Sequence, residues 1–302
     1  MAGRIRIGIS GWTYAPWRGV FYPKRLPQKR ELAYAAEHFP SIEINGSFYS
    51  LQRPASYEAW RDATPRDFVF ALKGSRYITH MRRLRDAEQG LANFLASGPL
   101  ALGEKLGPML WQLPPNFIFK PEVIEPFLQL LPRDTLQAAE LARGHEARLR
   151  GRAFLQPEKK QRLRHAMEVR HESFVCEEFI RLLRKYNVAL VCADTVEWPL
   201  LMDVTADFLY LRLHGSEELY KSGYGPKALD TWADRIHRWA AGGDVKGRHA
   251  SAKEAAKRKS GRDVFVYFDN DAKVRAPKDA QGLMRRLGIA WDRQTQSRVI
   301  AE

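Results

Sequence analysis

Eight short runs rich in β-branched and aromatic residues recur along the chain, and they constrain its fold more than any other feature of the sequence. The runs are RIRIGISGW (4–12), SIEINGSFY (41–49), DFVFALKG (67–74), GPMLWQLP (107–114), HAMEVRH (165–171), VALVCAD (188–194), DFLYLRLHG (207–215) and DVFVYFDND (263–271). Longer segments separate most of them. Strand-like runs that alternate with such segments predict βαβ units and a parallel sheet.

Helix-compatible segments fill most of these intervals. They are residues 27–38, 54–62, 86–102, 121–131, 174–186, 230–241 and 277–287. The interval between the sixth and seventh runs is short, so its helix is expected to be small or missing. Eight units predict an α/β fold, a single-domain (β/α)8 TIM barrel over residues 1–302. The alternative is an open doubly wound sheet, but the sequence contains neither GxGxxG nor GxxxxGK[ST].

Positive charge is concentrated in two segments. The chain has a net charge of +14. Residues 133–164 hold nine Lys or Arg against four Asp or Glu, and residues 246–262 hold seven against one. We expect a basic helical insertion before the fifth strand (133–164) and a flexible basic loop (244–262). Both are αβ connections, which lie on the N-terminal face of a barrel, opposite the usual active site. They are either solvated surface or a docking surface for nucleic acid.

The sequence predicts a cytoplasmic protein with no membrane partner. No apolar run approaches the roughly 18 residues of a membrane span, and the N-terminus passes directly into a strand pattern without the apolar region of a secretory signal. The two cysteines, Cys176 and Cys192, form no CxxC or Cys/His zinc spacing.

Side-chain alternation predicts polar residues inside the barrel. In the second strand Ile42 and Ile44 are expected to face the helices, which turns Glu43 and Asn45 inward. The same reasoning turns four charged residues of the fifth and seventh strands inward, namely Glu168, Arg170, Arg212 and His214. Near other strand ends it selects Lys73, Gln112, Asp194 and Asp269. Ionisable residues at the C-terminal ends of several strands are typical of barrel active sites, although a structural network of ion pairs is the alternative.

At these residues the sequence resembles the YecE-like family, catalogued as domain of unknown function 72. The resemblance rests on GISGWTYAPWRGVFYP (8–23), EINGSFY (43–49), KLGPMLWQLPPNF (105–117), EVRHESF (168–174), YLRLHG (210–215) and YFDNDAKVRAPKDA (267–280). It implies a TIM-barrel fold and no established activity. This chain departs from the family pattern at Asp269, where the family more often has Asn. The carboxylate adds a possible base or metal ligand, and argues against a role that needs a neutral hydrogen-bond donor there.

The residue types suggest roles in acid/base chemistry. Glu168, beside Arg170, is expected to stay ionised and act as base, the more isolated Glu43 to act as acid, and His214 to carry protons. Asp194 and Asp269 complete the catalytic set. Arg170 and Arg212 are expected to clamp an anionic substrate with their forked donors. The other predicted substrate-binding residues are Trp12, Asn45, Lys73, His80, Gln112, Lys221 and Asn270. Lys221 lies in a Gly-containing loop after the seventh strand, where barrels often bind phosphate.

Three functions stay open. The first is a hydrolase, lyase or isomerase that acts by acid/base chemistry on a phosphorylated or other anionic small molecule. The second is an endonuclease-like, nucleic-acid-processing barrel that uses divalent metals held by His and carboxylate side chains. The third is a non-catalytic nucleic-acid binder that uses residues 133–164 and 246–262. The sequence requires no cofactor, and whether a metal binds is unknown.

Overall fold

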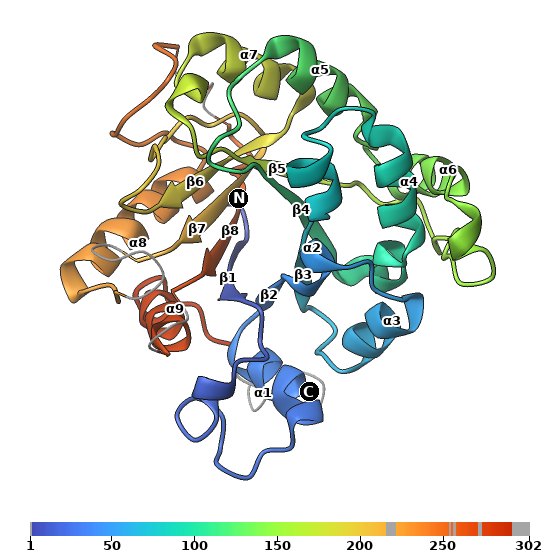
Figure 1. The fold of residues 1–302 in the computed structure, drawn as a ribbon. Helices are drawn as coiled ribbons and strands as arrows, with labels where there is room; N and C mark the ends of the chain where they lie inside the picture. The colour runs from blue at the N-terminus through green and yellow to red at the C-terminus, as the bar shows by residue number, and fades with distance from the viewer. Residues whose placement is uncertain (1, 216–221, 254, 256–257, 271–273, 292–302) are drawn as a thin grey trace.

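The eight predicted strands form one closed parallel barrel (Figure 1). In the computed structural model, residues 2–215, 222–253, 255, 258–270 and 274–291 are described. The strands are β1 (Ile5–Ser10), β2 (Ser41–Ile44), β3 (Val69–Lys73), β4 (Leu106–Gln112), β5 (His165–Glu168), β6 (Ala189–Asp194), β7 (Phe208–Leu213) and β8 (Asp263–Phe268). Each strand pairs with the next along the chain, and β8 pairs with β1. The prediction of a (β/α)8 barrel is therefore confirmed.

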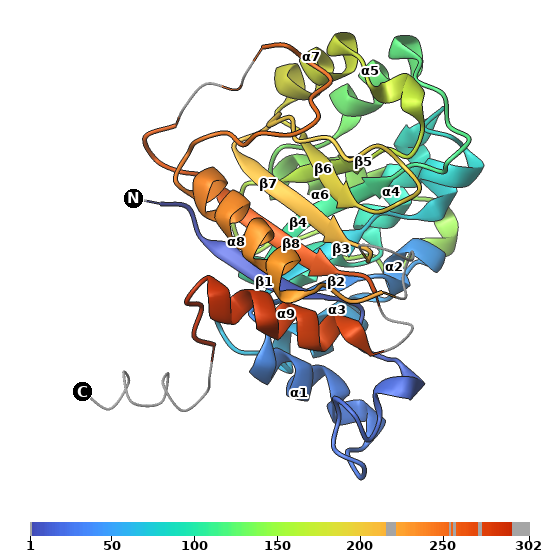
Figure 2. The ribbon, with the colours of Figure 1, turned by 90° about the vertical axis from the view of Figure 1, so that its left-hand side faces the viewer.

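Helices surround the barrel, as Figures 1 and 2 show. They are α1 (Glu31–His38), α2 (Gly46–Tyr49), α3 (Pro54–Asp62), α4 (Ala87–Ala96), α5 (Pro121–Leu130), α6 (Thr135–Arg143), α7 (Glu177–Tyr186), α8 (Pro226–Ala240) and α9 (Arg275–Arg286). Each of the seven predicted segments overlaps one helix. No helix in the described part of the chain is long and apolar enough to cross a membrane.

Residues 244–251, which follow α8, pack against the connection between β6 and β7. The connection from β6 to β7, residues 195–207, contains no helix. Arg248 O accepts a hydrogen bond from Met202 N at 2.9 Å, and Asp203 accepts two from the backbone of Ala250 and Ser251. Part of the predicted N-terminal-face loop therefore packs along this connection (Figure 2). Arg248 also pairs with Glu172 in the loop after β5, on the C-terminal side.

The predicted insertion between α5 and β5 is only partly helical. Its one α-helix, α6, packs against α4. Asp134 caps α6 by accepting hydrogen bonds from the backbone N–H groups of Leu136 and Gln137. This carboxylate satisfies donors that the first turn of a helix leaves without partners. From Gly144 to Arg164 the chain contains one short 3-10 turn and otherwise follows an irregular path to β5.

The barrel interior changes from aromatic to ionic along the strands. Near the N-terminal ends, Phe208 and Phe265 pack with ring centroids 6.0 Å apart. One layer further, Tyr210 and Tyr267 pack at 5.2 Å. The layer at the C-terminal ends holds charged side chains, which is where barrel enzymes carry their active sites.

Candidate active site at the barrel mouth

Arg212 of β7 is the centre of the ionic layer. Its side chain is not exposed to solvent, and it contacts three carboxylates. Nη1 donates to Glu168 Oε2 at 2.8 Å, while Nη2 donates to Glu43 Oε1 at 3.0 Å and to Asp269 Oδ2 at 2.7 Å. The alternation rule therefore correctly brought residues of β2, β5, β7 and the end of β8 together. Both terminal nitrogens of Arg212 are engaged by these carboxylates and the side chain is buried, so the structure does not support a direct clamp on a substrate.

Two hydroxyl groups hold Glu43. Ser10 Oγ donates to Oε1 at 2.8 Å, and the Tyr210 hydroxyl donates to Oε2 at 2.5 Å. Sequence reasoning missed both residues. Tyr210 lies two positions before Arg212, so the same alternation would have found it. Ser10 faces Glu43 in the register of β1 and β2, and it supplies the polar strand end that the prediction lacked for β1.

Glu168 also holds Arg170, which is nearer the opening. Nε and Nη2 of Arg170 lie 2.8 and 2.7 Å from Glu168 Oε1. The guanidinium lies over the ring of Trp198, with Cζ 4.0 Å from the ring centroid. Arg170 retains 10% exposure of its side chain, against none for Arg212. Arg170 thus remains the arginine of this cluster that can meet a ligand.

His214 lies between two carboxylates. Its Nδ1 is 3.1 Å from Asp269 Oδ2, and its Nε2 is 4.0 Å from Glu168 Oε2. The ring is buried and meets the edge of Trp198 at 5.7 Å. His214 therefore lies near both acidic groups at the mouth.

Glu168 and Asp269 stay ionised beside Arg212. Burial raises the pKa of Glu168, but attraction to Arg212 and Arg170 outweighs burial and holds that pKa well below its usual range. For Asp269, burial is again opposed by Arg212 and by the hydrogen bond from His214, and the net effect lowers the pKa to about 2. Neither group is suited to donate a proton near neutral pH, and the low pKa of Glu168 agrees with the ionised state expected for a carboxylate beside Arg170.

Lys73 is a buried cation that has no carboxylate partner among the residues the structure describes. Lys73 is 8% exposed, and its Nζ makes no hydrogen bond or ion pair with the described residues. Nζ instead lies over the ring of Phe48, 4.4 Å from the centroid. Burial, assisted by repulsion from Arg212, lowers the Lys73 pKa to about 8. Lys73 therefore titrates closer to neutrality than an ordinary lysine.

His80 comes to the same mouth on an unusual backbone turn. It lies in a π-helical turn, Tyr77–Met81, and its ring meets the edge of Phe48 at 5.1 Å. Burial and repulsion from cations, chiefly Lys73 and Arg170, lower the His80 pKa to about 4. Just beyond the turn, Arg83, Leu84 and Asp86 have positive φ angles of 50°, 65° and 44°. Clustered π-turns and left-handed residues are frequent beside functional sites.

Two amide side chains present buried acceptors at the mouth. Gln112 of β4 pairs in register with Glu168 and is 5% exposed. Its Oε1, like Oδ1 of Asn45, is buried and makes no hydrogen bond to the described residues. Buried polar atoms normally have partners, so these atoms are suited to a ligand's donors or to water.

The inward orientation predicted for Asp194 is wrong. On β6, Val191 and Ala193 face the interior, which turns Asp194 toward the surrounding helices. Its Oδ2 accepts a hydrogen bond from Nε1 of Trp232 on α8 at 2.9 Å. Burial raises the Asp194 pKa, an effect that hydrogen bonds from Trp232 and Tyr224 partly offset.

Asn270 also turns away from the barrel interior. It donates to Asp279 Oδ2 on α9 at 2.8 Å and to Ser222 O at 3.0 Å. Asp279 Oδ2 accepts from Tyr224 N as well. Asn270 therefore braces the loop between β7 and α8, and its predicted contact with substrate is not supported. Lys221 of the same loop lies outside the described residues.

Two further predictions concern Trp12 and a metal site. Trp12 is half-buried and packs edge-on against Trp60 of α3, with centroids 5.4 Å apart. Among the described residues, no three His, Cys, Asp or Glu side chains are grouped as metal ligands. The carboxylates of Glu43, Glu168 and Asp269 direct oxygens to Arg212.

The closed parallel barrel and the ionic layer at its mouth define a TIM-barrel protein with a site at the C-terminal ends of its strands. The chain belongs to the family described as protein of unknown function DUF72, whose model matches residues 6–300. It is 33% identical over 123 residues to the UPF0759 protein YunF of Bacillus subtilis strain 168, and 32% identical over 114 residues to the UPF0759 protein YecE of Escherichia coli K12.

These curated matches cover only part of each protein. The match to YunF spans 39% of this chain and 43% of YunF, and the match to YecE spans 37% and 39%. Solved structures of DUF72 family proteins are similar over nearly the whole chain. The protein from Thermotoga maritima MSB8 has a TM-score of 0.70 at 22% identity, covering 94% of this chain and 99% of that one. The protein from Enterococcus faecalis V583 gives 0.67 at 18%, covering 95% and 97%.

Proposed function

We propose that this protein is an enzyme that performs acid/base chemistry on an anionic small molecule at the barrel mouth. The observation that carries the proposal is Lys73, a buried amine with no carboxylate partner among the described residues and a pKa lowered to about 8. Keeping a lysine in this state costs stability, because burial disfavours the charged amine. Such perturbed groups cluster at functional sites.

The charge near the opening favours an anionic ligand. Three carboxylates and three cations make up the ionic layer: Glu43, Glu168, Asp269, Lys73, Arg170 and Arg212. The fully buried Glu43 and Glu168 lie below, while Arg170 and Lys73 retain some exposure. All four charged residues that perturb His80 are cations, namely Lys73, Arg170, Arg76 and Arg83. An anion would enter a positive field at this point.

Lys73 supplies a group that can both accept and donate a proton. With a pKa of about 8, about a tenth of the amine is neutral at pH 7. The neutral amine acts as a general base, and the ammonium form acts as a general acid. The ionised Glu168 and Asp269 fix Arg212 and His214, and His214 can return protons to the layer. A proton transfer from a positioned group contributes about 10²–10⁴-fold to a rate.

The reaction is accordingly a hydrolysis, elimination or isomerisation of a phosphorylated or carboxylated molecule. Arg170 binds the anionic group, and the free oxygens of Gln112 and Asn45 accept hydrogen bonds from the hydroxyl or amino groups of the substrate. We place the enzyme in the cytoplasm, where the two free cysteines, Cys176 and Cys192, would stay reduced.

The test is conversion of a defined metabolite pool. The purified protein is incubated with a mixture of sugar phosphates and carboxylic acids, and products are followed by mass spectrometry. We expect at least one anionic compound to be converted, and Lys73→Met to lower that conversion at least a hundredfold. Lys29→Met, at an exposed lysine before α1, is the matched control and keeps the wild-type rate. Conversion that survives Lys73→Met, or no conversion of any compound by the wild type, contradicts the proposal.

A further inference from the structure

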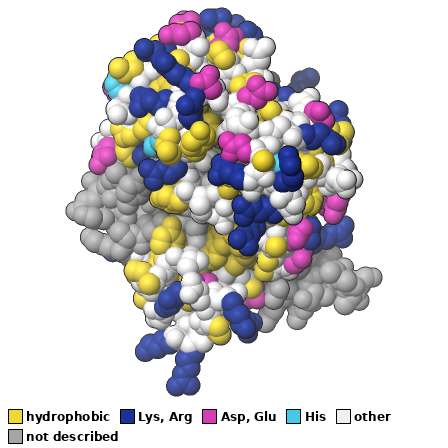
Figure 3. Space-filling view, turned by 45° about the vertical axis from the view of Figure 1, so that its right-hand side comes forward, with side chains coloured by type: hydrophobic (Ala, Val, Ile, Leu, Met, Phe, Trp, Pro, Cys, Tyr) yellow, Lys and Arg dark blue, Asp and Glu magenta, His cyan; other side chains and the backbone are white. Residues whose placement is uncertain are grey.

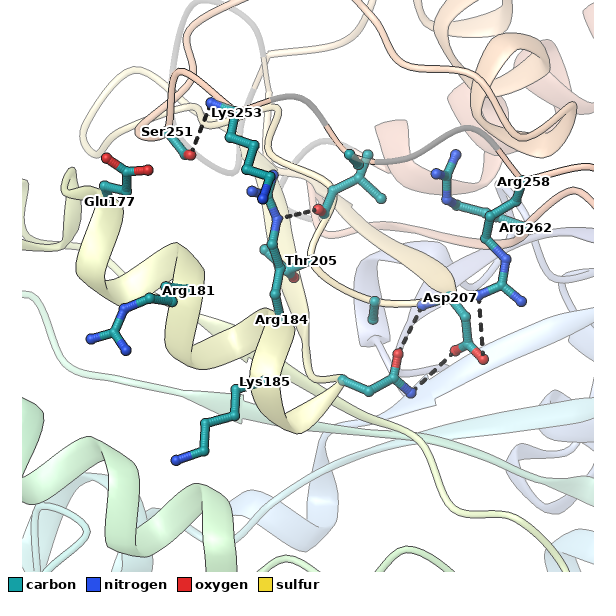
Figure 4. Close-up of a pocket in the computed structure, with 14 residues that line it drawn as sticks. Glu177, Arg181, Arg184, Lys185, Thr205, Asp207, Ser251, Lys253, Arg258 and Arg262 are labelled. Carbon is teal, nitrogen blue, oxygen red and sulfur yellow. Dashed lines mark hydrogen bonds and ion pairs between the residues drawn. The ribbon is translucent and has the colours of Figure 1, made fainter.

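A second concave site lies away from the mouth, beside α7. This basic groove has a volume of about 730 Å³. The residues of α7 that line it extend from Glu177 to Lys185, and the floor comes from residues 204–207 just before β7. The other wall comes from Ser251, Lys253, Ala255, Arg258 and Arg262. Figure 4 shows Arg181 and Arg184 on α7, and Arg258 and Arg262 near Asp207.

Cations dominate the lining of the basic groove. Six basic residues and two acidic ones, Glu177 and Asp207, line it. The cations are Arg181, Arg184, Lys185, Lys253, Arg258 and Arg262. Arg184 is fixed by a hydrogen bond from Nε to Val204 O at 3.2 Å, and Arg262 by one from Nη1 to Gly243 O at 2.7 Å. Figure 3 shows another face of the molecule, where Lys and Arg side chains are interspersed with Asp and Glu.

The two basic segments identified in the sequence meet at this groove. Arg162, from residues 133–164, lies 2.5 Å from Asp207 Oδ2 through Nη1. Arg258, from residues 246–262, lies 3.9 Å from the same oxygen. One carboxylate therefore joins the two segments, and Arg162 adds a cation beside those that line the groove. A small anion needs only two or three cations, so this extent fits a polyanion better.

We infer that the basic groove binds the phosphate backbone of a nucleic acid without reading its sequence. No aromatic residue is among those that line the groove, so it lacks the platform on which single-stranded bases stack. Its guanidinium and ammonium groups match phosphate oxygens. The groove lies before the start of β7 and the mouth lies beyond its end, so roughly 20 Å of strand separates them. The two sites can therefore be tested independently.

The test is the salt dependence of binding to a fluorescein-labelled 24-bp DNA duplex, followed by fluorescence anisotropy. The groove variant is Arg181→Gln/Lys253→Gln/Arg258→Gln, at three exposed residues. Each lost phosphate contact lowers the slope of log affinity against log salt by about 0.9, so we expect the slope to fall by about 2.7. We also expect affinity at 0.1 M salt to fall at least tenfold. The matched control, Lys24→Gln/Arg25→Gln/Lys29→Gln, removes the same charge from exposed residues elsewhere.

The control variant should bind the duplex with nearly the wild-type slope. Equal weakening of both variants would mean that diffuse net charge holds the DNA, which overturns the inference. The absence of duplex binding by the wild type overturns it too, even if ATP alone binds in the groove. If the triple variant has a lower melting temperature than the wild type, the single variants Arg181→Gln and Lys253→Gln replace it. Each should lower the slope of log affinity against log salt by about 0.9. Unchanged slopes in both single variants would likewise overturn the inference.

Discussion

Arg212 of β7 and Glu43 of β2 lie 3.0 Å apart, and neither side chain is exposed to solvent. Because Arg212 also holds Glu168 and Asp269, one guanidinium neutralises much of the charge at the top of the barrel. Burying such a cluster is costly unless every charge is paired. The cluster therefore both stabilises the barrel and forms the floor of the proposed site.

Replacing Arg212 should destabilise the protein strongly. Arg212→Met leaves three carboxylates without their shared cation, and we expect the free energy of unfolding to fall by about 3–5 kcal/mol in urea denaturation. Arg82→Met is the control, since Arg82 pairs with the exposed Asp86, and it should cost less than about 1 kcal/mol. A loss below about 1 kcal/mol for Arg212→Met would show that the cluster does not need this cation.

The Asp269 carboxylate should make stability depend on pH. Its pKa is lowered to about 2 from 3.8, so its stabilising effect is present above pH 3.8 and is lost as the pH falls toward 2. Asp269→Asn removes this term. Between pH 5 and 2, the unfolding free energy of the wild type should fall more steeply than that of the variant, by up to about 1.4 kcal/mol per pH unit. If the unfolding free energies of the wild type and Asp269→Asn fell in parallel with pH, the ion pair between Asp269 and Arg212 would be contradicted. The control is Glu140→Gln, at an exposed residue, whose unfolding free energy should follow the same pH dependence as the wild type.

Asp194 should behave as a support for α8. Asp194→Asn keeps an acceptor for Trp232 Nε1 and should change the unfolding free energy by less than about 1 kcal/mol. Asp194→Ala leaves a buried donor unpaired and should cost about 1–3 kcal/mol. Urea denaturation distinguishes these outcomes. An alanine variant as stable as the wild type would argue against the contact with α8.

His80 reports the positive field at the mouth. Its pKa is lowered to about 4, first by burial and then by cations that include Arg170. Arg170→Gln should therefore raise the His80 pKa, because it removes one repulsive charge. Titration of the imidazole signals by NMR measures this shift. An unchanged His80 pKa in Arg170→Gln would place Arg170 too far from His80 to act on the same ligand. The control is Arg148→Gln, at an exposed residue of the insertion, which should leave the His80 pKa unchanged.

Strict alternation made much of the site predictable. In β2, β5 and β7 apolar residues occupy every second position, so Glu43, Glu168 and Arg212 could be assigned to the interior from sequence. In β6 the residues Ala189–Ala193 are apolar at every position, and alternation could not show which face Asp194 takes. The hydrogen bond between Asn270 and Asp279 of α9 could not be predicted either, because no local sequence pattern indicates it.

Other features depend on contacts between distant segments. Residues 244–251 pack against the connection between β6 and β7, where Asp203 accepts two hydrogen bonds from that segment. The sequence of a loop does not predict such packing. The π-helical turn that carries His80 has no clear sequence signature. The lowered pKa of Lys73 also required the structure, because it depends on how completely the barrel buries the amine and where Arg212 lies.

The most direct test of the proposed site is the pKa of Lys73. Protein labelled with ¹³C at the lysine Cε positions can be titrated by NMR, with Lys73→Met identifying the signal of interest and Lys29→Met serving as the control assignment. We predict a midpoint at about pH 8, well below that of the exposed lysines. A midpoint near 10.5, the ordinary value, would contradict a buried and unpaired amine and with it the acid/base site at the barrel mouth.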